Sequence, residues 1–450
     1  MSDQRNHRRK VGTSVELFAG GGGLAQAVHN AGFRPLLVNE FHKRACETLV
    51  ENHAMRFGKE DIPIPESEDT WWPLYEGDVK DLEFDYLLDE EVDVLAGGPP
   101  CQPFSLGGVH KGDEDERNMF PQMFRAMEQM RPKAVICENV RGLLRASFAP
   151  YFQYILKAME APWVARARYS SWEEHDDALR DALAREPLNS ARRYVVDPMP
   201  VNAADFGVPQ IRHRVIIVAF RADLGVDWES HRPTARYSER ALINSIVGGK
   251  YWKRHQDVPP EVRERVVASL PKDLPADNLK PWRTLRDALK GIDWHDNGKD
   301  VERELPPVPA EYLKPKRHVD DDPTIDPLHF GWPGARKYAG HTPNVLDRPA
   351  KTVKAGVHGV PGGESVIELD DPTYDGTGYR YMTVREAARV MTFPDDWKLK
   401  GPRGEQMRQL GNAVPVKLGE VFADAVAVAL EAAGVEPKER AKKRRARDKG

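Results

Sequence analysis

The feature that most constrains the fold is an alternation of short apolar runs and amphipathic stretches across the first half of this 450-residue chain. The apolar runs that predict strands are Val15–Phe18, Leu36–Val38, Val92–Ala96, Ala134–Cys137 and Val215–Phe220. The stretches that predict helices are Leu24–Ala31, Arg44–Asn52 and Met119–Met130. This alternation is typical of a parallel sheet covered by helices, so we predict an α/β fold.

The second half of the chain has a different sequence pattern. From Ala222 to Tyr379 the alternation fails, and prolines, glycines and tryptophans divide the sequence into irregular pieces. The strand and helix pattern returns at Thr383–Met391, and an apolar helix is predicted at Val416–Ala433, where it would pack back on the sheet. A chain that leaves a sheet domain, builds a separate unit and returns implies two lobes with a cleft between them.

A lone cysteine follows one of the predicted strands on a turn with the sequence Gly97-Gly98-Pro99-Pro100-Cys101-Gln102-Pro103-Phe104-Ser105. Most free cysteines are small buried hydrophobic residues. Two prolines, however, cannot extend a central strand, and polar Gln102 and Ser105 favour a cleft wall. We therefore interpret Cys101 as a reactive thiol, and Cys46 and Cys137 as packing residues.

Composition and charge exclude several classes of protein. Hydrophobic residues make up 40% of the chain and charged residues 30%, which is ordinary for a soluble globular protein. No apolar run approaches the roughly 20 residues of a membrane-spanning helix. The three cysteines fit neither a disulfide framework nor a zinc cluster, so we expect no metal site and a cytoplasmic, nucleoid-associated protein. The net charge of −4 gives no overall attraction to nucleic acid.

Seven further motifs accompany the cysteine turn. In chain order they are Leu17–Gly23, Asn39-Glu40, Gly77-Asp78-Val79, Glu138-Asn139-Val140, Gln210–Arg214, Arg385–Arg389 and Gly411–Val416. With the cysteine turn in its place, this series resembles the DNA (cytosine-5)-methyltransferase family, of the prokaryotic modification-enzyme type. The resemblance covers about Ser14 to Gly419, apart from a polar insertion and most of the irregular unit.

The resemblance implies a fold and an activity. The fold would be a Rossmann-like S-adenosylmethionine-dependent methyltransferase domain with a second, smaller and irregular target-recognition domain. The activity would be methyl transfer from S-adenosylmethionine to carbon 5 of a cytosine flipped out of a specific double-stranded DNA sequence, through a covalent adduct with Cys101. A flipped base is expected because a thiol cannot reach carbon 6 inside a stacked duplex.

On this basis we divide the chain into five segments. They are a basic N-terminal tail (1–13), a catalytic domain (14–221), a target-recognition domain (222–380), a return to the catalytic domain (381–435) and a basic C-terminal tail (436–450). The polar insertion interrupts the catalytic domain at about 162–194, with a helix predicted at Trp172–Leu183.

A glycine-rich turn between a strand and a helix lets the backbone approach a ligand closely, and an acid at the end of the next strand can hold ribose hydroxyls. Glu40 occupies that position. Taken alone, the glycine run also fits a plain tight turn or a nicotinamide site, and Asp78 also fits a turn. The resemblance implies S-adenosylmethionine instead, with cofactor contacts from Phe18, Gly20, Gly22, Glu40, Phe41, Asp78, Val79, Pro99 and Asn412.

The chemistry needs a nucleophile and an acid. Because the thiolate is the reactive form of cysteine, the site should supply positive charge near Cys101. Arg212 and Arg214, two apart on a predicted strand, would point the same way into the cleft, although they also fit solvent-facing charges on an edge strand. Glu138 follows a buried strand, where an unpaired carboxylate is costly, and it suits a group that hydrogen bonds ring nitrogen 3 and the amine of cytosine. The predicted catalytic residues are therefore Cys101, Glu138, Arg212 and Arg214.

Double-stranded DNA is the expected partner, and a cognate restriction endonuclease of the same system is a candidate second partner. We expect a monomer that does not bind membranes. The polar, glycine-bearing segment Leu106–Asn118 is predicted to close over the flipped base. The predicted DNA contacts are Gln102, Ser105, Arg117, Gln210, Lys351 and Thr352.

Three other interpretations remain open. An RNA methyltransferase of the same fold is one, although the tRNA-modifying branch of the family usually has a Cys-Phe-Thr signature that this chain lacks. Unrelated RNA enzymes place the attacking cysteine where Cys137 stands. A noncatalytic DNA-binding regulator of this ancestry would have lost Cys101 or Glu138, and both are present.

Overall fold

The structure is a computed structural model, and it describes residues 12–66, 71–100, 118–271, 274–291, 326–337, 342–355 and 365–435. Cys101, Gln102, Ser105, Arg117 and nearly all of the predicted closing segment 106–118 lie outside the described residues. Both predicted tails also lie outside them, apart from Gly12 and Thr13.

An eight-stranded sheet has the order β3-β4-β2-β1-β5-β6-β8-β7. The six strands from β3 to β6 in that order are parallel, and β8 is antiparallel to both of its neighbours. The strands are β1 (Gly12–Leu17), β2 (Phe33–Glu40), β3 (Ala54–Phe57), β4 (Trp72–Glu76), β5 (Val94–Gly97), β6 (Ala134–Val140), β7 (Tyr194–Asn202) and β8 (His213–Arg221). The α/β prediction is confirmed.

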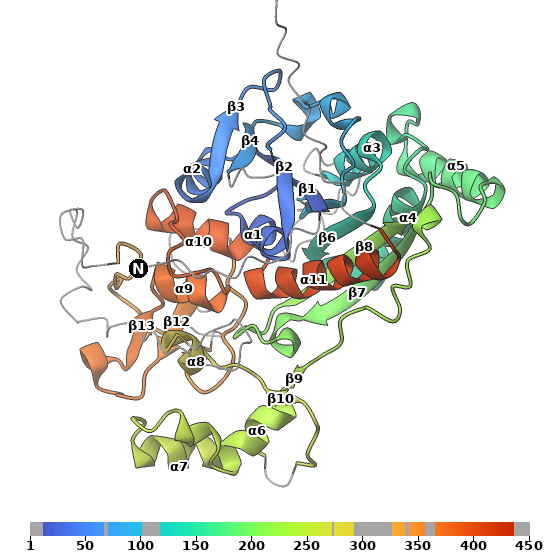
Figure 1. The fold of residues 1–450 in the computed structure, drawn as a ribbon. Coiled ribbons are helices and arrows are strands. Elements are labelled where there is room, and N and C mark those ends of the chain that lie inside the picture. Colours follow the sequence, from blue (N-terminus) through green and yellow to red (C-terminus); the bar gives the residue numbers. More distant parts are fainter. Residues whose placement is uncertain are drawn as a thin grey trace, which may run out of the picture.

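Alternating side chains give each strand two buried faces. Leu95 of β5 joins the core cluster of α3 (Phe120–Met130) and α4 (Ala149–Glu160), whereas its neighbours Val94 and Ala96 join the cluster of α11 (Val416–Ala432) on the opposite face. α11 packs along α1 (Gly23–Asn30) (Figure 1). The C-terminal helix therefore returns to the sheet, as predicted.

The antiparallel pair at one end of the sheet differs from the prediction. The run at Val215–Phe220 forms β8, but it is antiparallel and lies inside the sheet. Arg214 is therefore not on an edge strand, and Arg212 precedes the strand. The edge strand is β7, which the sequence pattern did not reveal. Pro198 and Pro200 lie within it, and prolines are tolerated at an edge because one side of the strand needs no ladder hydrogen bonds.

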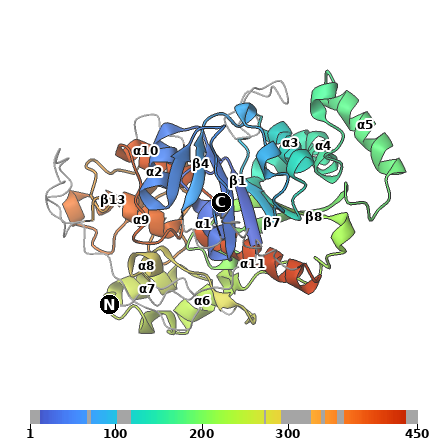
Figure 2. The ribbon, with the colours of Figure 1, turned by 45° about the horizontal axis from the view of Figure 1, so that its top comes forward.

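The polar insertion contains α5 (Trp172–Arg185), which packs on α4 through buried His175 and Leu179. This helix lies at the predicted place. Figure 2 shows α5 on the opposite side of the molecule from α6 (Glu239–Val247) and α7 (Pro260–Ala268).

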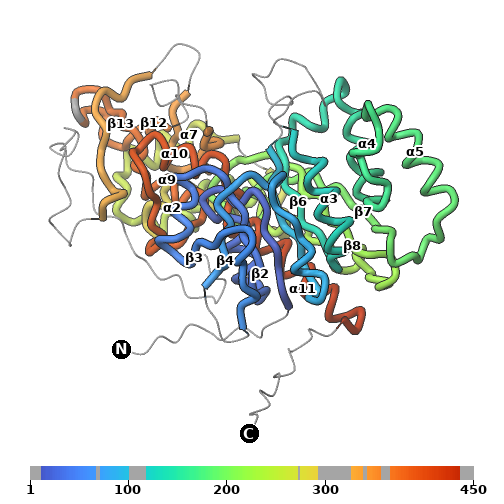
Figure 3. Tube along the Cα trace, turned by 90° about the horizontal axis from the view of Figure 1, so that it is seen from above, coloured from blue at the N-terminus to red at the C-terminus, as the bar shows by residue number. Residues whose placement is uncertain are grey.

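The helices and strands from β9 to α10 form what we call the second lobe. Besides α6 and α7 it contains β9 (Tyr237–Ser238), β10 (Lys280–Pro281), α8 (Leu285–Leu289), β11 (Asn344–Val345), β12 (Val366–Glu368), β13 (Tyr379–Tyr381), α9 (Val384–Val390) and α10 (Arg403–Asn412). Figure 3 shows α9 and α10 beside α2 (Lys43–Asn52).

One apolar core cluster joins the second lobe to the sheet. It contains Leu49 of α2 and Leu74 of β4 together with Leu285, Ile367 and Leu410. The predicted boundary at residue 380 therefore does not coincide with a break in the core, although the domain boundaries themselves stay predictions. In the part of the chain that the structure describes, no helix combines the length and the apolar character needed to cross a membrane.

Candidate active site

Several of the predicted cofactor and catalytic residues that the structure describes lie at one edge of the sheet. Because β1, β2, β4, β5 and β6 are parallel, their carboxyl ends lie together, and ligands of open α/β sheets bind at such edges. The described residues at this edge are Phe18 after β1, Glu40 ending β2, Asp78 after β4, Gly98 and Pro99 after β5, and Glu138 near the end of β6.

The turn after β1 has an unusual backbone. Phe18 has φ 57° and Gly20 has φ 55°, both in the left-handed region. Gly22, with φ 90°, caps α1, and a Cβ added there would lie 2.8 Å from the Trp397 ring. Only glycine fits that position without displacing the tryptophan.

Glu40 organises this turn through its carboxylate. Oε2 accepts a hydrogen bond from the Gly20 amide at 2.7 Å, and Oε1 accepts from the amides of Phe41 and His42 at 3.0 and 2.7 Å. The residue is 7% exposed. Its described contacts are thus to the backbone, so it shapes the cofactor turn in addition to the ribose contact that the sequence predicts.

The side chains next to Glu40 suit a nucleoside. Phe41 is 68% exposed, an unusual setting for a large aromatic ring and one that leaves its face available for stacking. Asp78 is exposed as well, while its Oδ1 accepts a hydrogen bond from the Lys80 amide at 3.0 Å. Val79, by contrast, is buried in the apolar core.

Arg125 of α3 supports this end of the site, and the sequence analysis missed it. Its guanidinium donates to the carbonyls of Val79 at 2.7 Å and Leu82 at 2.9 Å, which bracket the short turn after Asp78. An arginine in an amphipathic helix is usually interpreted as a surface charge, so the sequence alone offers no signal for this contact.

Asn139 ties the cysteine turn to the sheet. Its Nδ2 donates to the Pro99 carbonyl at 3.1 Å, and its Oδ1 accepts from the Val140 amide at 2.9 Å. Pro99 is buried. The residue that precedes Cys101 by two positions is therefore fixed against β6, next to Glu138.

Glu138 pairs with Arg214. The Arg214 Nε lies 2.7 Å from Glu138 Oε1, and the two side chains are 12% and 9% exposed. The N–H does not point at the oxygen, so Oε1 has no hydrogen-bond partner among the residues that the structure describes. Glu138 is thus paired with a cation, but among the described residues its Oε1 keeps an acceptor position open for another donor.

Gly98 leaves space beside the second carboxylate oxygen. A Cβ built on Gly98 would lie 3.5 Å from Glu138 Oε2 and in ordinary contact with it. The end of β5, the end of β6 and the start of β8 therefore meet around one carboxylate and one guanidinium.

Arg212 has a different environment from Arg214. It is 1% exposed, and its guanidinium donates to the carbonyls of Val353, Gly411 and Ala413 at 3.1, 2.8 and 2.8 Å. Burial, with repulsion from Arg214, lowers the pKa of Arg212, and Glu138 opposes that shift. Arg212 thus lies near the other two charges. Its described contacts join the residue before β8 to Val353, to the end of α10 and to Ala413, which precedes α11.

The comparisons with known proteins bear directly on this arrangement. The family model described as C-5 cytosine-specific DNA methylase matches residues 12–161 and 184–427. The chain belongs to this family. It is accordingly a DNA (cytosine-5)-methyltransferase, and the predicted family membership is confirmed. Residues 162–183, which include most of α5, lie outside the match.

Curated relatives match over most of this chain. The type II methyltransferase M.Eco47II of Escherichia coli is 28% identical over 92% of this chain and 79% of its own length. M.NgoMIV of Neisseria gonorrhoeae is 26% identical over 93% of this chain and 98% of its own length. The solved structure of Entamoeba histolytica EhMeth shares the fold with a TM-score of 0.51 at 12% identity, covering 94% of this chain and 99% of that one.

Gln210 does not lie where a contact with DNA requires it. The side chain is fully buried, and its Nε2 lies 3.2 Å from the sulfur of Met391. The structure therefore argues against the predicted DNA contact. Residue 210 instead bridges to Ala350 in the second lobe, next to the junction at Arg212.

Lys351 and Thr352 lie on the segment of the second lobe that meets this junction. Thr352 is half-buried, and its Oγ1 donates to the Ile211 carbonyl at 2.8 Å. The Lys351 ammonium donates to the Thr342 carbonyl at 2.6 Å, within the same lobe. Both residues are partly accessible, so their contacts with DNA remain predictions.

The C-terminal end of α10 reaches the same place. Gly411 packs so closely on the chain at Ala355 that an added Cβ would lie 2.3 Å from its amide nitrogen. Asn412, which follows, is exposed. The Gly411-Asn412 pair thus has a close-packed residue followed by one that is free to face a ligand.

The two described cysteines are buried, which confirms their interpretation as packing residues. Cys137 faces the apolar core from β6, and burial raises the pKa of the Cys46 thiol above its ordinary range. A buried thiol inside a strand is a poor nucleophile, so the alternative with Cys137 as the attacking residue loses support.

Proposed function

We propose that this enzyme methylates carbon 5 of a cytosine flipped out of a specific double-stranded DNA sequence, through a covalent adduct with Cys101 and with S-adenosylmethionine as methyl donor. The observation that carries the proposal is the Glu138–Arg214 pair beside the turn that leads to Cys101. It offers an acceptor oxygen without a directed donor and a guanidinium in one small volume.

The residues at the carboxyl edge fit the cofactor. The exposed ring of Phe41 offers a stacking surface for adenine, and the exposed carboxylate of Asp78 can accept from its amine. Glu40 and the left-handed turn at Gly20 provide a polar cradle for the ribose and the amino acid end. When bound, S-adenosylmethionine supplies an electrophilic methyl group.

The chain's own residues activate the base. The Cys101 thiolate adds to carbon 6, forming an S–C bond and breaking the π bond between carbons 5 and 6. Glu138 holds ring nitrogen 3 and shares a proton with it, while Arg214 donates to the base carbonyl, so both stabilise the charge that moves into the ring. After carbon 5 has gained the methyl group, it loses its proton to solvent and the thiolate leaves, restoring the double bond.

The relatives are named as type II methyltransferases. We infer that this chain likewise acts within a restriction-modification system, where the partner would be a nuclease for the same DNA sequence. We also infer that it acts as a monomer in the cytoplasm.

Expression in a host without DNA methylation, followed by methylation-sensitive sequencing, tests the proposal. The expected result is 5-methylcytosine at one position of a fixed sequence, and no modification with Cys101→Ala. Unmodified DNA from cells containing the folded wild-type enzyme would contradict the proposed function.

A second experiment tests the covalent step alone. A duplex with 5-fluorocytosine at the target cannot lose a proton from carbon 5, so it should trap an adduct that depends on the cofactor. The adduct should be absent with Cys101→Ala and retained with Cys137→Ala. The reverse pattern would move the nucleophile to Cys137.

A further inference from the structure

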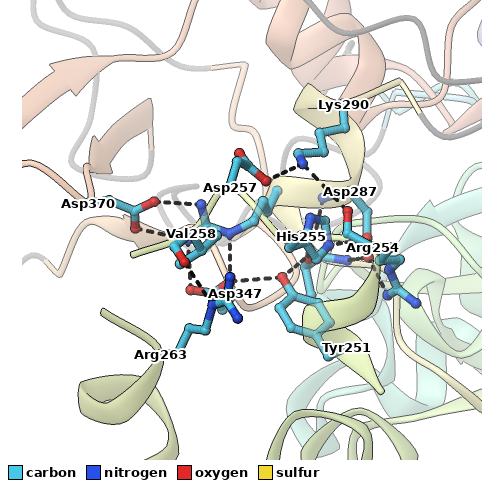
Figure 4. A network of polar contacts seen from close by, with 12 residues as sticks. Tyr251, Arg254, His255, Asp257, Val258, Arg263, Asp287, Lys290, Asp347 and Asp370 are labelled. Atoms are coloured by element: carbon cyan, nitrogen blue, oxygen red, sulfur yellow. Dashed lines mark hydrogen bonds and ion pairs between the residues drawn. The ribbon is translucent and has the colours of Figure 1, made fainter. Parts of the chain in front are cut away.

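A buried arginine of α8 holds two carboxylates at once. The Arg286 guanidinium donates to both oxygens of Asp347 at 2.7 and 2.9 Å, and to both oxygens of Asp370 at 2.6 and 2.9 Å. The Arg286 and Asp347 side chains are each 7% exposed, whereas Asp370 is 26% exposed. Figure 4 shows Asp347 and Asp370 within one polar network.

Asp347 has further support on the same side. The Tyr251 hydroxyl donates to its Oδ1 at 2.8 Å (Figure 4). The first amides of α8 donate to the chain on either side of Asp347, from Leu285 to the Arg348 carbonyl and from Arg286 to the Leu346 carbonyl, both at 2.8 Å. Residues 346–348 are therefore fixed by side-chain and backbone bonds together.

The same stretch of chain continues directly to the active-site wall. Ala350 exchanges backbone hydrogen bonds with residues 209 and 211, each at 2.8 Å. Thr352 bonds the Ile211 carbonyl and Val353 accepts from Arg212. Two residues beyond Arg212, Arg214 contacts Glu138.

We propose that Asp347 and Arg286 are positioning residues for the methyl-transfer reaction. They hold the segment 346–353 in register against residues 209–212, and so place Thr352 and the arginine side of the site relative to the target cytosine. This inference rests on the proposed function, because it concerns the same site. Its physical basis is that bidentate arginine–carboxylate pairs fix geometry, while a buried ion pair by itself adds little net stability.

The two carboxylates on Arg286 provide a matched test. Asp347→Asn and Asp370→Asn are the same substitution against the same guanidinium, but only residue 347 belongs to the segment 346–353. In either variant an amide nitrogen replaces an oxygen that accepted from Arg286, so both should lower the thermal unfolding temperature.

Their effects on catalysis should separate. We expect Asp347→Asn to lower kcat/KM for DNA by about tenfold or more, since small misplacements at a reacting centre are costly. With 2-aminopurine at the target, its fluorescence rise on binding should also shrink, while affinity for S-adenosylhomocysteine stays unchanged. Asp370→Asn should match the wild type in all three measurements. Equal losses in the two variants, or full activity in Asp347→Asn, would overturn the inference.

Hydrogen–deuterium exchange gives a readout that does not depend on activity. Asp347→Asn should speed exchange of amides in 344–353 and 209–212, whereas Asp370→Asn should leave them protected. Tyr251→Phe, a milder change that removes one hydroxyl donor to Asp347, should show the same pattern to a smaller extent and covers the case in which Asp347→Asn fails to fold. If the wild type itself forms no 5-methylcytosine, the proposed function fails; if only the contrast between the two variants is absent, the positioning role fails.

Discussion

The structure contains two buried arginine–glutamate pairs that differ in their hydrogen bonds. One is Glu138–Arg214 in the sheet, and the other is Glu386–Arg380 in the second lobe. Arg380 donates to both oxygens of Glu386 at 2.7 and 2.5 Å, and the Thr383 amide adds a third bond at 2.8 Å. Arg214 approaches Glu138 at 2.7 Å, but without a directed hydrogen bond to Oε1 from any described residue.

The difference in hydrogen bonding fits a structural role for Glu386 and the proposed catalytic role for Glu138. Glu386 completes the capping box of α9, and its carboxylate has nothing left to offer a ligand. Glu138 stands at the carboxyl edge of the sheet next to the cysteine turn, where a partly satisfied carboxylate can accept a donor from a substrate. Burial and charge alone would not distinguish the two residues.

The largest expected effect is on catalysis by Glu138. Glu138→Gln keeps the shape of the side chain but cannot share a proton with ring nitrogen 3, so kcat should fall by about 10²- to 10⁴-fold. Single-turnover methylation measures the loss, and circular dichroism should show an unchanged fold. The affinity of this variant for DNA should remain similar to that of the wild type. Full activity in this variant would remove Glu138 from the mechanism.

Glu386→Gln should have the opposite profile. It leaves the buried Arg380 without its counter-ion, and breaking one side of a buried pair costs about 3–5 kcal/mol of unfolding free energy. Urea unfolding measures this loss. The fraction that stays folded should keep the wild-type kcat. A large drop in kcat with unchanged stability would mean that the Glu386–Arg380 pair also takes part in the reaction.

The neighbouring arginines sharpen the comparison within the sheet. Lysine cannot reproduce the three carbonyl bonds of Arg212, so Arg212→Lys should lower stability by about 1–3 kcal/mol. Arg214→Lys should change stability less and kcat more, because its partner Glu138 is the carboxylate proposed to act on the base. Parallel unfolding and single-turnover assays test this, and equal profiles for the two variants would contradict it.

These contrasts also mark what the sequence could predict. Strands with dense apolar runs, such as β5 and β6, were found at the predicted places, although β6 continues to Val140 and therefore includes Glu138, which was predicted to follow it. Whether a charged residue is satisfied depends on distant partners: Arg212 meets Gly411 and Arg286 meets Asp347, and neither pairing leaves a local pattern. The short elements of the second lobe, such as five-residue α8, are too brief to show periodicity.

The smallest expected effect is the pH dependence that the satisfied pair adds to stability. Although burial by itself would raise the pKa of Glu386, the charge and hydrogen bonds of Arg380 hold it below its ordinary value. Between this lowered pKa and the unfolded value of about 4.3, the unfolded chain binds more protons than the folded one, so stability rises with pH there. The contribution to stability is complete above about pH 4.3 and is lost as the pH falls through the lowered pKa of the folded state.

Urea unfolding of wild type and Glu386→Gln at a series of pH values between 7 and 3.5 tests this expectation. The difference in unfolding free energy between the two proteins should be constant at first and should narrow below about pH 4.3. If the difference in unfolding free energy stays constant to the lowest pH, Arg380 does not lower the pKa of Glu386 in the folded protein.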